Sequence, residues 1–366
     1  MICQHFGTCG GCTLPGVPYA EQLARKRQFL SQLLGLDVPP LIPSPAESGF
    51  RSKVAFVFGP GVMGHYAARS QRIVPITECP VHHERGNRIA FALRDRLLRA
   101  RIPPGILRHI IVRTTADGRE SSAMLVVTRN DKSLRTPVRG LLASADKPDG
   151  FFINIHDKPG PYMVGEETIK IEGRSHVKEM VAGTSYLVSP TAFFQTNVGA
   201  AEALVKLVMD MVGGPGRASL RVLDLYCGSG LFSLPLAKSG AVVTAIEENR
   251  QAIEDAESNV RLNKLPAGSI RFIAGRVEDA LARAARDPWD AVVLDPPRQG
   301  CPPAVIAGVF EGIAPALVVY VSCNPDALAK ELPVILKTGY RVTRVQAVDM
   351  FPHTDHIETV MAFSRE

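Results

Sequence analysis

Short apolar runs alternate with amphipathic segments after residue 190, and this pattern constrains the fold more than any other feature of the sequence. The apolar runs are VLDL, VVTAIE, IRFIAG, AVVLD and LVVYVS, and segments with helical spacing separate them, namely 249–262, 277–286 and 326–336. Apolar strands that alternate with helices are typical of a doubly wound parallel sheet with helices on both faces. We therefore expect an α/β, Rossmann-like fold here, with ligands bound at the carboxyl ends of the strands.

The first 175 residues have a different pattern. Short β-type runs such as KVAFVFG, IIVRT, AMLVV and FFINI dominate, and only two segments, 18–34 and 86–101, have clear helical spacing. A chain of 366 residues is long for one domain. We therefore predict a β-rich N-terminal region, residues 1–175, followed by the α/β domain, residues 176–366.

Positive charge is concentrated in the N-terminal part of the chain. Residues 1–150 carry 21 Lys and Arg against 11 Asp and Glu, whereas the remaining residues carry 21 against 25. The excess is densest in an arginine-rich segment, residues 84–113. Such asymmetry indicates a polyanionic partner, and we predict nucleic acid, although a solvated helix face is the commoner meaning of a charge run.

The cellular compartment is predicted from the absence of targeting and membrane-spanning patterns in the sequence. There is no signal-peptide pattern and no apolar stretch long enough to span a bilayer. We therefore expect a cytoplasmic protein with no membrane association. In that compartment its seven cysteines are expected to act as metal ligands, as a nucleophile or as small apolar residues rather than as disulfides.

A glycine turn and an acid predict a nucleoside site at the carboxyl edge of the sheet. The first strand runs into a turn that contains Gly228 and Gly230, where the backbone can pass close to a ligand. The third glycine of a dinucleotide fingerprint and the Gly-Lys-Ser of a phosphate loop are missing. Glu247 ends the next strand and could accept both ribose hydroxyls, or could instead be a surface acid at the start of the next helix. We predict S-adenosylmethionine, whose nucleoside has no phosphates.

Three further residues stand where strands reach the same edge: Asp295, Cys323 and Glu358. Two prolines follow Asp295, and Asp-Pro-Pro is similar to the motif of methyltransferases that act on planar nitrogenous rings. A thiolate that adds to C6 of uracil makes C5 nucleophilic, and a base must later remove the C5 proton so that the thiolate can leave. We predict Cys323 as this nucleophile and Glu358 as this base, against the alternative of a small apolar cysteine and a paired acid.

The whole chain resembles the RNA 5-methyluridine (uracil-C5) methyltransferases, in the iron–sulfur branch whose members modify 23S ribosomal RNA. The matching motifs are, in order, SPTAFFQTN, DLYCGSG, LDPPRQG, VSCNP and FPHTDHIETV. The resemblance implies cofactor contacts at Gln195, Tyr226, Glu247 and Asp295, with Asp295 also near the target base. It also leads us to expect the form without the extra N-terminal RNA-binding barrel of larger relatives.

Four cysteines form a candidate metal site near the start of the chain: Cys3, Cys9, Cys12 and Cys79. By themselves they suit structural zinc and an iron–sulfur cluster about equally. The resemblance implies a [4Fe–4S] cluster, held by segments 1–45 and 76–100, with a structural rather than a redox role. His82 and His83 keep a zinc site open, but we expect both to be exposed and to face RNA.

These observations lead to one main functional hypothesis: S-adenosylmethionine-dependent methylation of C5 of a specific uridine in RNA. We predict 23S ribosomal RNA as the substrate and a monomer as the active form. The alternatives are a tRNA uracil-C5 enzyme, an RNA cytosine-C5 methyltransferase and a catalytically idle RNA-binding assembly factor. The cytosine enzymes carry a second cysteine after the acid of the fourth strand, where this chain has Pro297 and Arg298.

Overall fold

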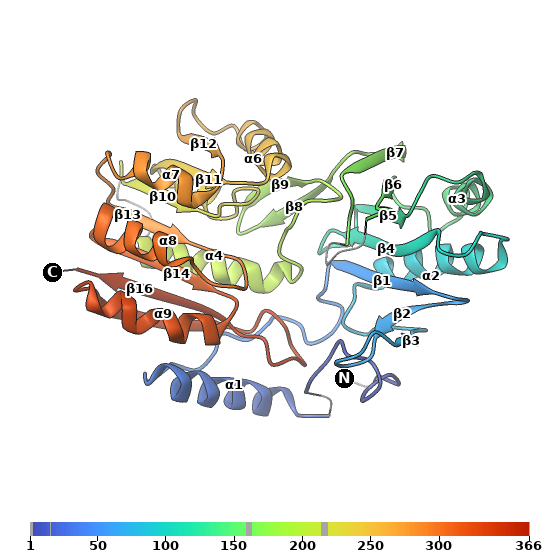
Figure 1. Ribbon diagram of the computed structural model, residues 1–366, viewed down its shortest axis with the longest axis horizontal. Helices are drawn as coiled ribbons and strands as arrows, with labels where there is room; N and C mark the ends of the chain where they lie inside the picture. Colours follow the sequence, from blue (N-terminus) through green and yellow to red (C-terminus); the bar gives the residue numbers. More distant parts are fainter. Residues whose placement is uncertain (1–2, 15, 159–162, 214–218, 366) are drawn as a thin grey trace.

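The computed structural model describes residues 3–14, 16–158, 163–213 and 219–365. Within these residues the chain forms two seven-stranded sheets and a two-stranded hairpin. The two large sheets lie side by side, each with its own helices (Figure 1). We call them the N-terminal sheet and the C-terminal sheet. None of the described helices is long and apolar enough to cross a membrane.

The N-terminal sheet has the strand order β3-β2-β1-β4-β5-β6-β7. Its pairs are antiparallel except β5 with β6, which are parallel and are joined by a 3-10 turn and a helix. A parallel pair needs such a crossover, because a tight turn would reverse the chain. The strands are β1 (Lys53–Gly59), β2 (Val62–Tyr66), β3 (Ile73–Pro75), β4 (Leu107–Thr114), β5 (Ser121–Val127), β6 (Gly150–Ile155) and β7 (Glu167–Gly173).

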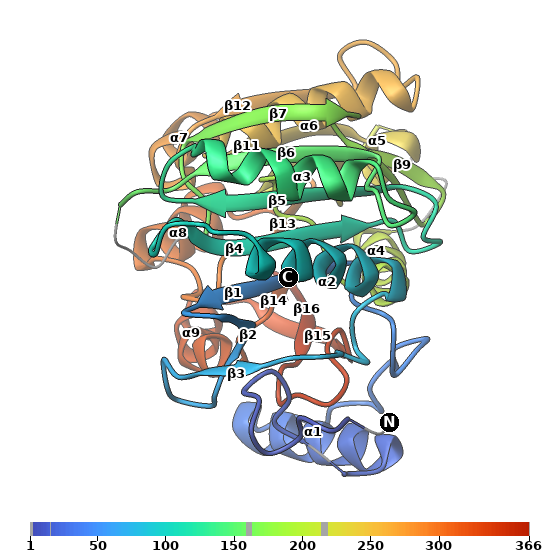
Figure 2. The ribbon, with the colours of Figure 1, turned by 90° about the vertical axis from the view of Figure 1, so that its right-hand side faces the viewer.

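Two helices cover one face of this sheet, α2 (Glu84–Arg99) and α3 (Arg135–Leu142), with the turn η1 (Lys132–Leu134) before α3. In Figure 2 they lie in front of the sheet, and the C-terminal sheet lies behind it. Val54 and Phe56 of β1 pack in the core beneath α2, so the alternate residues Lys53 and Ala55 lie on the opposite face. That opposite face is turned toward the C-terminal sheet.

The C-terminal sheet has the order β12-β11-β10-β13-β14-β16-β15. The first five strands of this order pair in parallel, as expected, but β16 is antiparallel to both of its neighbours, β14 and β15. The nine-residue connection between β15 and β16 is too short for a crossover, so the chain must return in the opposite direction. The strands are β10 (Arg221–Leu225), β11 (Val242–Glu247), β12 (Ile270–Ala274), β13 (Ala291–Leu294), β14 (Leu317–Ser322), β15 (Arg341–Val348) and β16 (Glu358–Ser364).

Helices cover both faces of the C-terminal sheet, as the sequence predicts. One face packs against α4 (Val198–Val212), α5 (Ser233–Lys238), α6 (Arg250–Leu262) and the hairpin of β8 (Val177–Val181) and β9 (Thr184–Val188). The other face packs against α1 (Tyr19–Leu34), α7 (Val277–Ala284), α8 (Pro303–Ala307), the π-helical turn η2 (Gly308–Ile313) and α9 (Pro325–Lys337).

Helix α1 comes from the start of the chain but packs on the C-terminal sheet. Its buried residues Leu30 and Leu34 share a core with strands β13, β14 and β16. A buried ion pair joins Lys26 Nζ to Asp349 Oδ1 at 2.8 Å, in the loop that connects β15 to β16. Residues 19–34 thus belong structurally with the C-terminal sheet, although they come before the N-terminal sheet in the chain. The division at residues 175/176 stays a prediction.

Candidate active site

The turn after β10 has a strained backbone that faces the carboxyl edge of the C-terminal sheet. Tyr226, Gly228 and Gly230 have φ values of 64°, 53° and 87°. The φ of Gly230 favours glycine, and a Cβ there would lie 2.1 Å from Cδ1 of the buried Leu234, which would have to move. Tyr226 is not glycine, and a left-handed conformation costs such a residue about 1 kcal/mol or more. Strain of this kind clusters at ligand sites.

Glu247 ends β11 beside this turn and is held by backbone donors. Gly228 N–H donates to its Oε2 at 3.0 Å, and Asn249 N–H donates to its Oε1 at 2.8 Å. Asn249, and not Glu247, caps helix α6, since its side chain accepts from Gln251 N–H and Ala252 N–H. Glu247 is therefore not needed as the cap of helix α6, and the glycine turn orients its carboxylate.

The described residues at this edge fit an S-adenosyl cofactor. Tyr226 Oη and Ser229 Oγ are buried without a hydrogen-bond partner in the described part of the chain. Burial raises the pKa of Asp224 to about 7, and burial together with the neighbouring carboxylates raises that of Asp295 to about 7. Unpaired polar atoms and crowded carboxyl groups at one edge suit a polar nucleoside whose sulfonium carries a positive charge.

Gln195 lies in the loop between β9 and α4 and is buried. Its neighbour Thr196 accepts a hydrogen bond at 2.7 Å from the backbone N–H of Ser52, so this loop joins the two sheets. Two residues earlier, Phe193 is 71% exposed. The contact of Gln195 with the cofactor stays a prediction.

The antiparallel pairing of β14 with β16 brings the predicted nucleophile and base together. Ser322, the last residue of β14, pairs with Thr359, so Cys323, which follows the strand, comes level with Glu358, whose charge acts on it. Asp295 follows β13, the parallel neighbour of β14 on its other side. The structure therefore places Cys323, Glu358 and Asp295 together at the carboxyl edge of β13 and β14.

The electrostatics of this group are those of a crowded, poorly solvated acid cluster. Burial first, and then repulsion by Asp295, raises the pKa of Glu358 well above its usual range, while Arg298 opposes this shift. Burial, Glu358 and Asp295 raise the pKa of Cys323 to about 11, and Arg298 again lowers it. Both shifts favour the uncharged forms of the two groups, so each needs a neighbouring positive charge such as that of Arg298 to ionise readily.

Arg298 is a residue whose role the sequence analysis missed. In the sequence it stands out only because, with Pro297, it occupies the place where the cytosine enzymes carry a second cysteine. In the structure its carbonyl accepts a hydrogen bond from Asn324 Nδ2 at 2.8 Å, next to Cys323, and its positive charge favours the ionised forms of Cys323 and Glu358. The position of Arg298, a positive residue three places after Asp295, was the sequence feature that could have indicated this role.

The two remaining cysteines of this half are core residues. Cys227 is buried within the glycine turn. Cys301, which the sequence left without a role, is also buried. Its backbone N–H donates to Glu331 Oε1 at 2.8 Å, and Tyr320 donates to the other oxygen of that carboxylate at 2.6 Å. Neither cysteine lies with Cys323.

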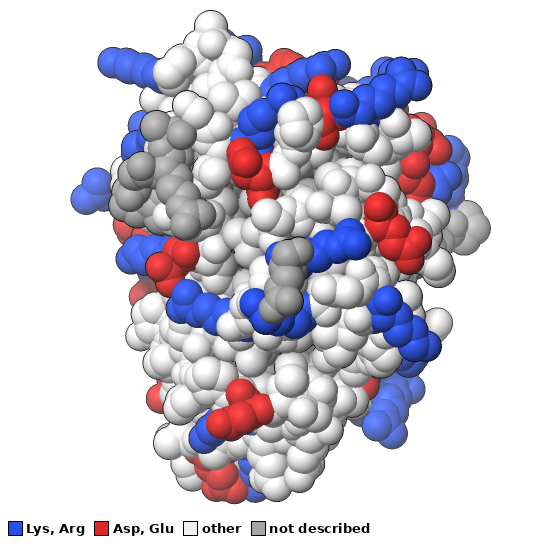
Figure 3. Space-filling view, turned by 90° about the vertical axis from the view of Figure 1, so that its left-hand side faces the viewer, with Lys and Arg blue, Asp and Glu red and all other residues white. Residues whose placement is uncertain are grey.

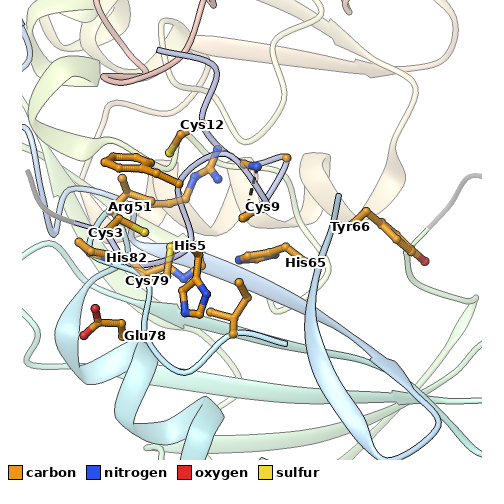
Figure 4. Close-up of a pocket in the computed structure, with 16 residues that line it drawn as sticks. Cys3, His5, Cys9, Cys12, Arg51, His65, Tyr66, Glu78, Cys79 and His82 are labelled. Atoms are coloured by element: carbon orange, nitrogen blue, oxygen red, sulfur yellow. Dashed lines mark hydrogen bonds between the residues drawn. The ribbon is translucent and has the colours of Figure 1, made fainter. Parts of the chain in front are cut away.

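The four N-terminal cysteines line one cavity of about 240 Å³. All of them are free and half-buried in the structure, and they surround a common space (Figure 4). Backbone hydrogen bonds fix the segment that carries three of them, including one of 2.9 Å from Gly10 N–H to Tyr66 O. A Cβ at Gly10 would lie 2.8 Å from Ala68 N, so glycine is needed for this close approach.

Histidines also belong to this cavity. One ligand atom each from His65, Cys79 and His82 lie within 4.8 Å of one another. The expectation that His82 and His83 are exposed is wrong. His82 is 3% exposed and packs edge-on against Phe56, while half-buried His83 caps α2 by accepting from Arg85 N–H at 3.2 Å. His82 is buried because it packs against apolar side chains, and His83 is half-buried because it caps a helix. The expectation relied only on the polarity of the histidine ring.

The donor set fits a soft metal centre. Burial raises the pKa of Cys79 to about 12 and that of Cys12 to about 11, so the cysteines are thiols until a positive charge stabilises their thiolates. His82 Nδ1 is buried without a hydrogen-bond partner among the described residues. Arg51 lies beside the same cavity, where its charge favours thiolates at Cys79 and Cys12.

Acids neutralise three of the five arginines of helix α2, whereas Arg96 and Arg99 form no ion pair within the described chain. Arg85 pairs with Asp149 at 2.9 Å, Arg88 with Glu84, and Arg94 with Asp95 at 2.8 Å. Helix α2, which carries them, lies on the face of the N-terminal sheet that is turned away from the C-terminal sheet (Figure 2). At the opposite end of the molecule, positive and negative side chains are interspersed (Figure 3). The positive groups nearest the active site must come from other elements.

Known proteins agree with this arrangement. The profile described as tRNA (Uracil-5-)-methyltransferase matches residues 165–366. An uncharacterised RNA methyltransferase of Gloeobacter violaceus is 33% identical over 99% of this chain and 82% of its own length, and one of Geobacter sulfurreducens is 32% identical over 98% and 76%. The crystal structure of Pyrococcus abyssi tRNA (uracil-54, C5)-methyltransferase with S-adenosyl-L-homocysteine superposes with a TM-score of 0.82 at 29% identity, covering 97% of this chain and 84% of that one. The chain therefore belongs to the tRNA (uracil-5-)-methyltransferase family and is an S-adenosylmethionine-dependent RNA methyltransferase.

Proposed function

We propose that this protein methylates C5 of a uridine in RNA, with Cys323 as the nucleophile and Glu358 as the general base. The observation that carries the proposal is the register of β14 and β16, which brings these two residues level with each other. A thiol and a carboxyl group on adjacent strands can reach C6 and C5, which are neighbouring atoms of one pyrimidine ring. A methyltransferase of amino groups would have no use for this pair.

The reaction divides between the two residues. The Cys323 thiolate adds to C6, and the electron density of the C5–C6 double bond moves toward C5 and O4. S-adenosylmethionine supplies the methyl group that C5 takes up. The Glu358 carboxylate then removes the C5 proton, the C–H electron pair restores the double bond, and the sulfur of Cys323 leaves as a thiolate.

The raised pKa values support these roles. A carboxylate that is buried beside Asp295 is a stronger base than one in water, which suits removal of a carbon-bound proton. Cys323 needs help to ionise, and Arg298 is the positive group among the charges that act on it. Gln195, Tyr226, Gly228, Gly230, Glu247 and Asp295 are the residues that we propose to hold the methyl donor.

The RNA substrate is the finer part of the proposal. The sequence resemblance favours a uridine of 23S ribosomal RNA. The Pyrococcus abyssi protein, by its name, acts on uracil-54 of tRNA, and its high TM-score makes tRNA the second candidate. We expect the active form to be a monomer, which light scattering during size-exclusion chromatography would test.

We also propose that Cys3, Cys9, Cys12 and Cys79 hold a [4Fe–4S] cluster. Four thiols around one cavity and a neighbouring arginine support a cluster of thiolates with net negative charge. The group of His65, Cys79 and His82 supports zinc as the alternative. Iron, sulfide and zinc analysis of anaerobically purified protein decides between them, and Cys79→Ser should lose the metal in either case.

The central experiment supplies labelled S-adenosylmethionine with unmodified ribosomal RNA or tRNA and identifies the product by mass spectrometry. We expect 5-methyluridine, and no product with Cys323→Ala. A 5-methylcytidine product or a methylated amino group would contradict the roles of Cys323 and Glu358. If neither RNA is labelled although the variant and the wild type both bind RNA, the assembly-factor alternative is favoured.

A further inference from the structure

A row of positive side chains lies on the face of the N-terminal sheet that is turned toward the C-terminal sheet. Lys53 of β1 pairs in register with Arg113 of β4, so both side chains lie on the same face. Arg51 precedes Lys53 by two residues on the extended chain and lies on that side as well. Arg113 Nη2 donates to Ala192 O at 3.1 Å, which ties this face to the loop that carries Phe193 and Gln195.

Lys53 is a half-buried positive group that no acid of the described chain neutralises. Its side chain makes no ion pair and no hydrogen bond in the described part of the chain, and the one charged group that acts on it is another cation, Arg113. Burial, and then Arg113, lower the pKa of Lys53 to about 7. The side chain is half-buried and therefore still reachable from solvent.

The neighbours of Lys53 do not remove the need for an anion. Arg113 is 3% exposed, and its Nε is buried without a hydrogen-bond acceptor among the described residues. Glu179 and Asp255 attract Arg113 but form no ion pair with it within the described chain. Burying the positive charges of Lys53 and Arg113 side by side, without an acid to pair with them, costs free energy. A bound anion would offset that cost.

The row leads directly to the reacting edge. Ser52, next to Lys53, donates its backbone N–H to Thr196 O at 2.7 Å, and Thr196 follows Gln195. At the other end of the row, Arg51 acts on Arg298 and on His356. Because Arg51 acts on Arg298 and Arg298 acts on Cys323, the row of positive side chains continues toward the reacting edge, whereas the arginines of α2 lie on the far face.

We propose that Lys53, supported by Arg113, binds a phosphate of the RNA backbone beside the target uridine. This inference rests on the proposed function and names the residue that holds the substrate at its site. Phosphate suits the position because an ammonium is a compact donor to a phosphate oxygen and Arg113 adds charge behind it. Arg51 is left to the metal cavity, where its charge acts on Cys12 and Cys79.

The test compares Lys53→Met with Lys337→Met. Lys337 is exposed at the end of α9, and this thirteen-residue helix begins next to Cys323 and runs away from it, so this control removes one positive charge far from the row. RNA binding is measured over a range of salt concentrations with a single-stranded oligouridylate, and the KM for RNA, kcat and the affinity for S-adenosylmethionine are measured separately.

Lys53→Met should weaken RNA binding and raise the KM about 10-fold, with kcat and cofactor affinity little changed. The slope of log affinity against log salt should fall by about 0.7, the value for one phosphate contact on single-stranded RNA. Lys337→Met should match the wild type, and Lys53→Arg should recover most of the affinity.

An unchanged salt slope in Lys53→Met would overturn the inference, and so would a fall in kcat without a change in KM. Because this variant removes an unpaired charge, its thermal stability should not fall, and Lys53→Arg separates loss of charge from loss of fold. The proposed function can fail independently, since binding is measured without turnover. A wild type that binds oligouridylate through Lys53 but methylates no RNA would refute the proposed function alone.

Discussion

The ion pair between α1 and the loop before Glu358 allows a sharp stability prediction. Lys26 Nζ lies 2.8 Å from Asp349 Oδ1 and 3.2 Å from the carbonyl oxygen of Phe351. The two charged side chains are 3% and 0% exposed. Lys26→Met keeps most of the aliphatic stem of the side chain but removes the ammonium, so the change is mainly electrostatic.

The magnitude follows from what the substitution leaves behind. Asp349 would stay buried with Phe351 N–H, at 3.2 Å to Oδ1, and the neighbouring hydroxyl of Tyr19 as its remaining donors. Removing one member of a buried pair costs about 3–5 kcal/mol. Burial lowers the pKa of Lys26 more than Asp349 raises it, so the pair itself contributes little to stability. The double variant Lys26→Met/Asp349→Asn should therefore recover most of the loss.

Urea unfolding of the C-terminal sheet, followed by the fluorescence of Trp289, measures these effects. The control is Arg25→Met, which breaks the exposed pair of Arg25 with Glu21 on the same helix and should cost less than about 0.5 kcal/mol. A loss below about 1 kcal/mol in Lys26→Met would refute the reasoning. The same conclusion would follow if Asp349→Asn recovered nothing in the double variant.

Three further predictions concern the site itself. Glu358→Gln should still form the bond between Cys323 and RNA but release it slowly, so a covalent protein–RNA adduct should accumulate on denaturing gels, and its absence would speak against Glu358 as the base. Gly230→Ala should lose cofactor binding in calorimetry, because its Cβ would lie 2.1 Å from Leu234 Cδ1, whereas Gly268→Ala, with open space around it, should not. The pKa of buried Asp224 is raised to about 7, so the folded protein keeps a proton that the unfolded chain releases near pH 4. Stability should therefore fall as pH rises from about 4 to 7, by up to about 4 kcal/mol at about 1.4 kcal/mol per pH unit, and urea unfolding of Asp224→Asn should lack this part of the slope.

Local patterns in the sequence carry most of the fold. Strand and helix periods are short-range properties, so the C-terminal α/β alternation and the β-rich first half could both be predicted, with helix ends within about two residues. Helix α2 was expected at residues 86–101 and spans Glu84–Arg99, because the side chain of His83 caps it earlier. The glycine turn, Glu247 at the end of β11 and Asp295 just after β13 could also be predicted, because their positions follow from the strands that precede them.

Contacts between distant segments could not be read in this way. The reversal of β16 depends on a short connection and on which strand it joins, and this reversal brings Glu358 level with Cys323. The partner of α1 is a loop more than three hundred residues away. Burial of His82 beside Phe56 depends on side chains from another strand, which its own neighbours in the sequence do not reveal.

The pairing of charged residues is another property that the sequence alone does not reveal. The sequence by itself determined that positive residues gather in the first 150 positions, and it determined the residue types that a uracil-C5 methyltransferase needs. Only the tertiary structure decided which charges are free, because ion pairing depends on distances in space rather than on order along the chain. It pairs three of the arginines of α2 with nearby acids and leaves Lys53 of strand β1 without a counter-ion among the described residues.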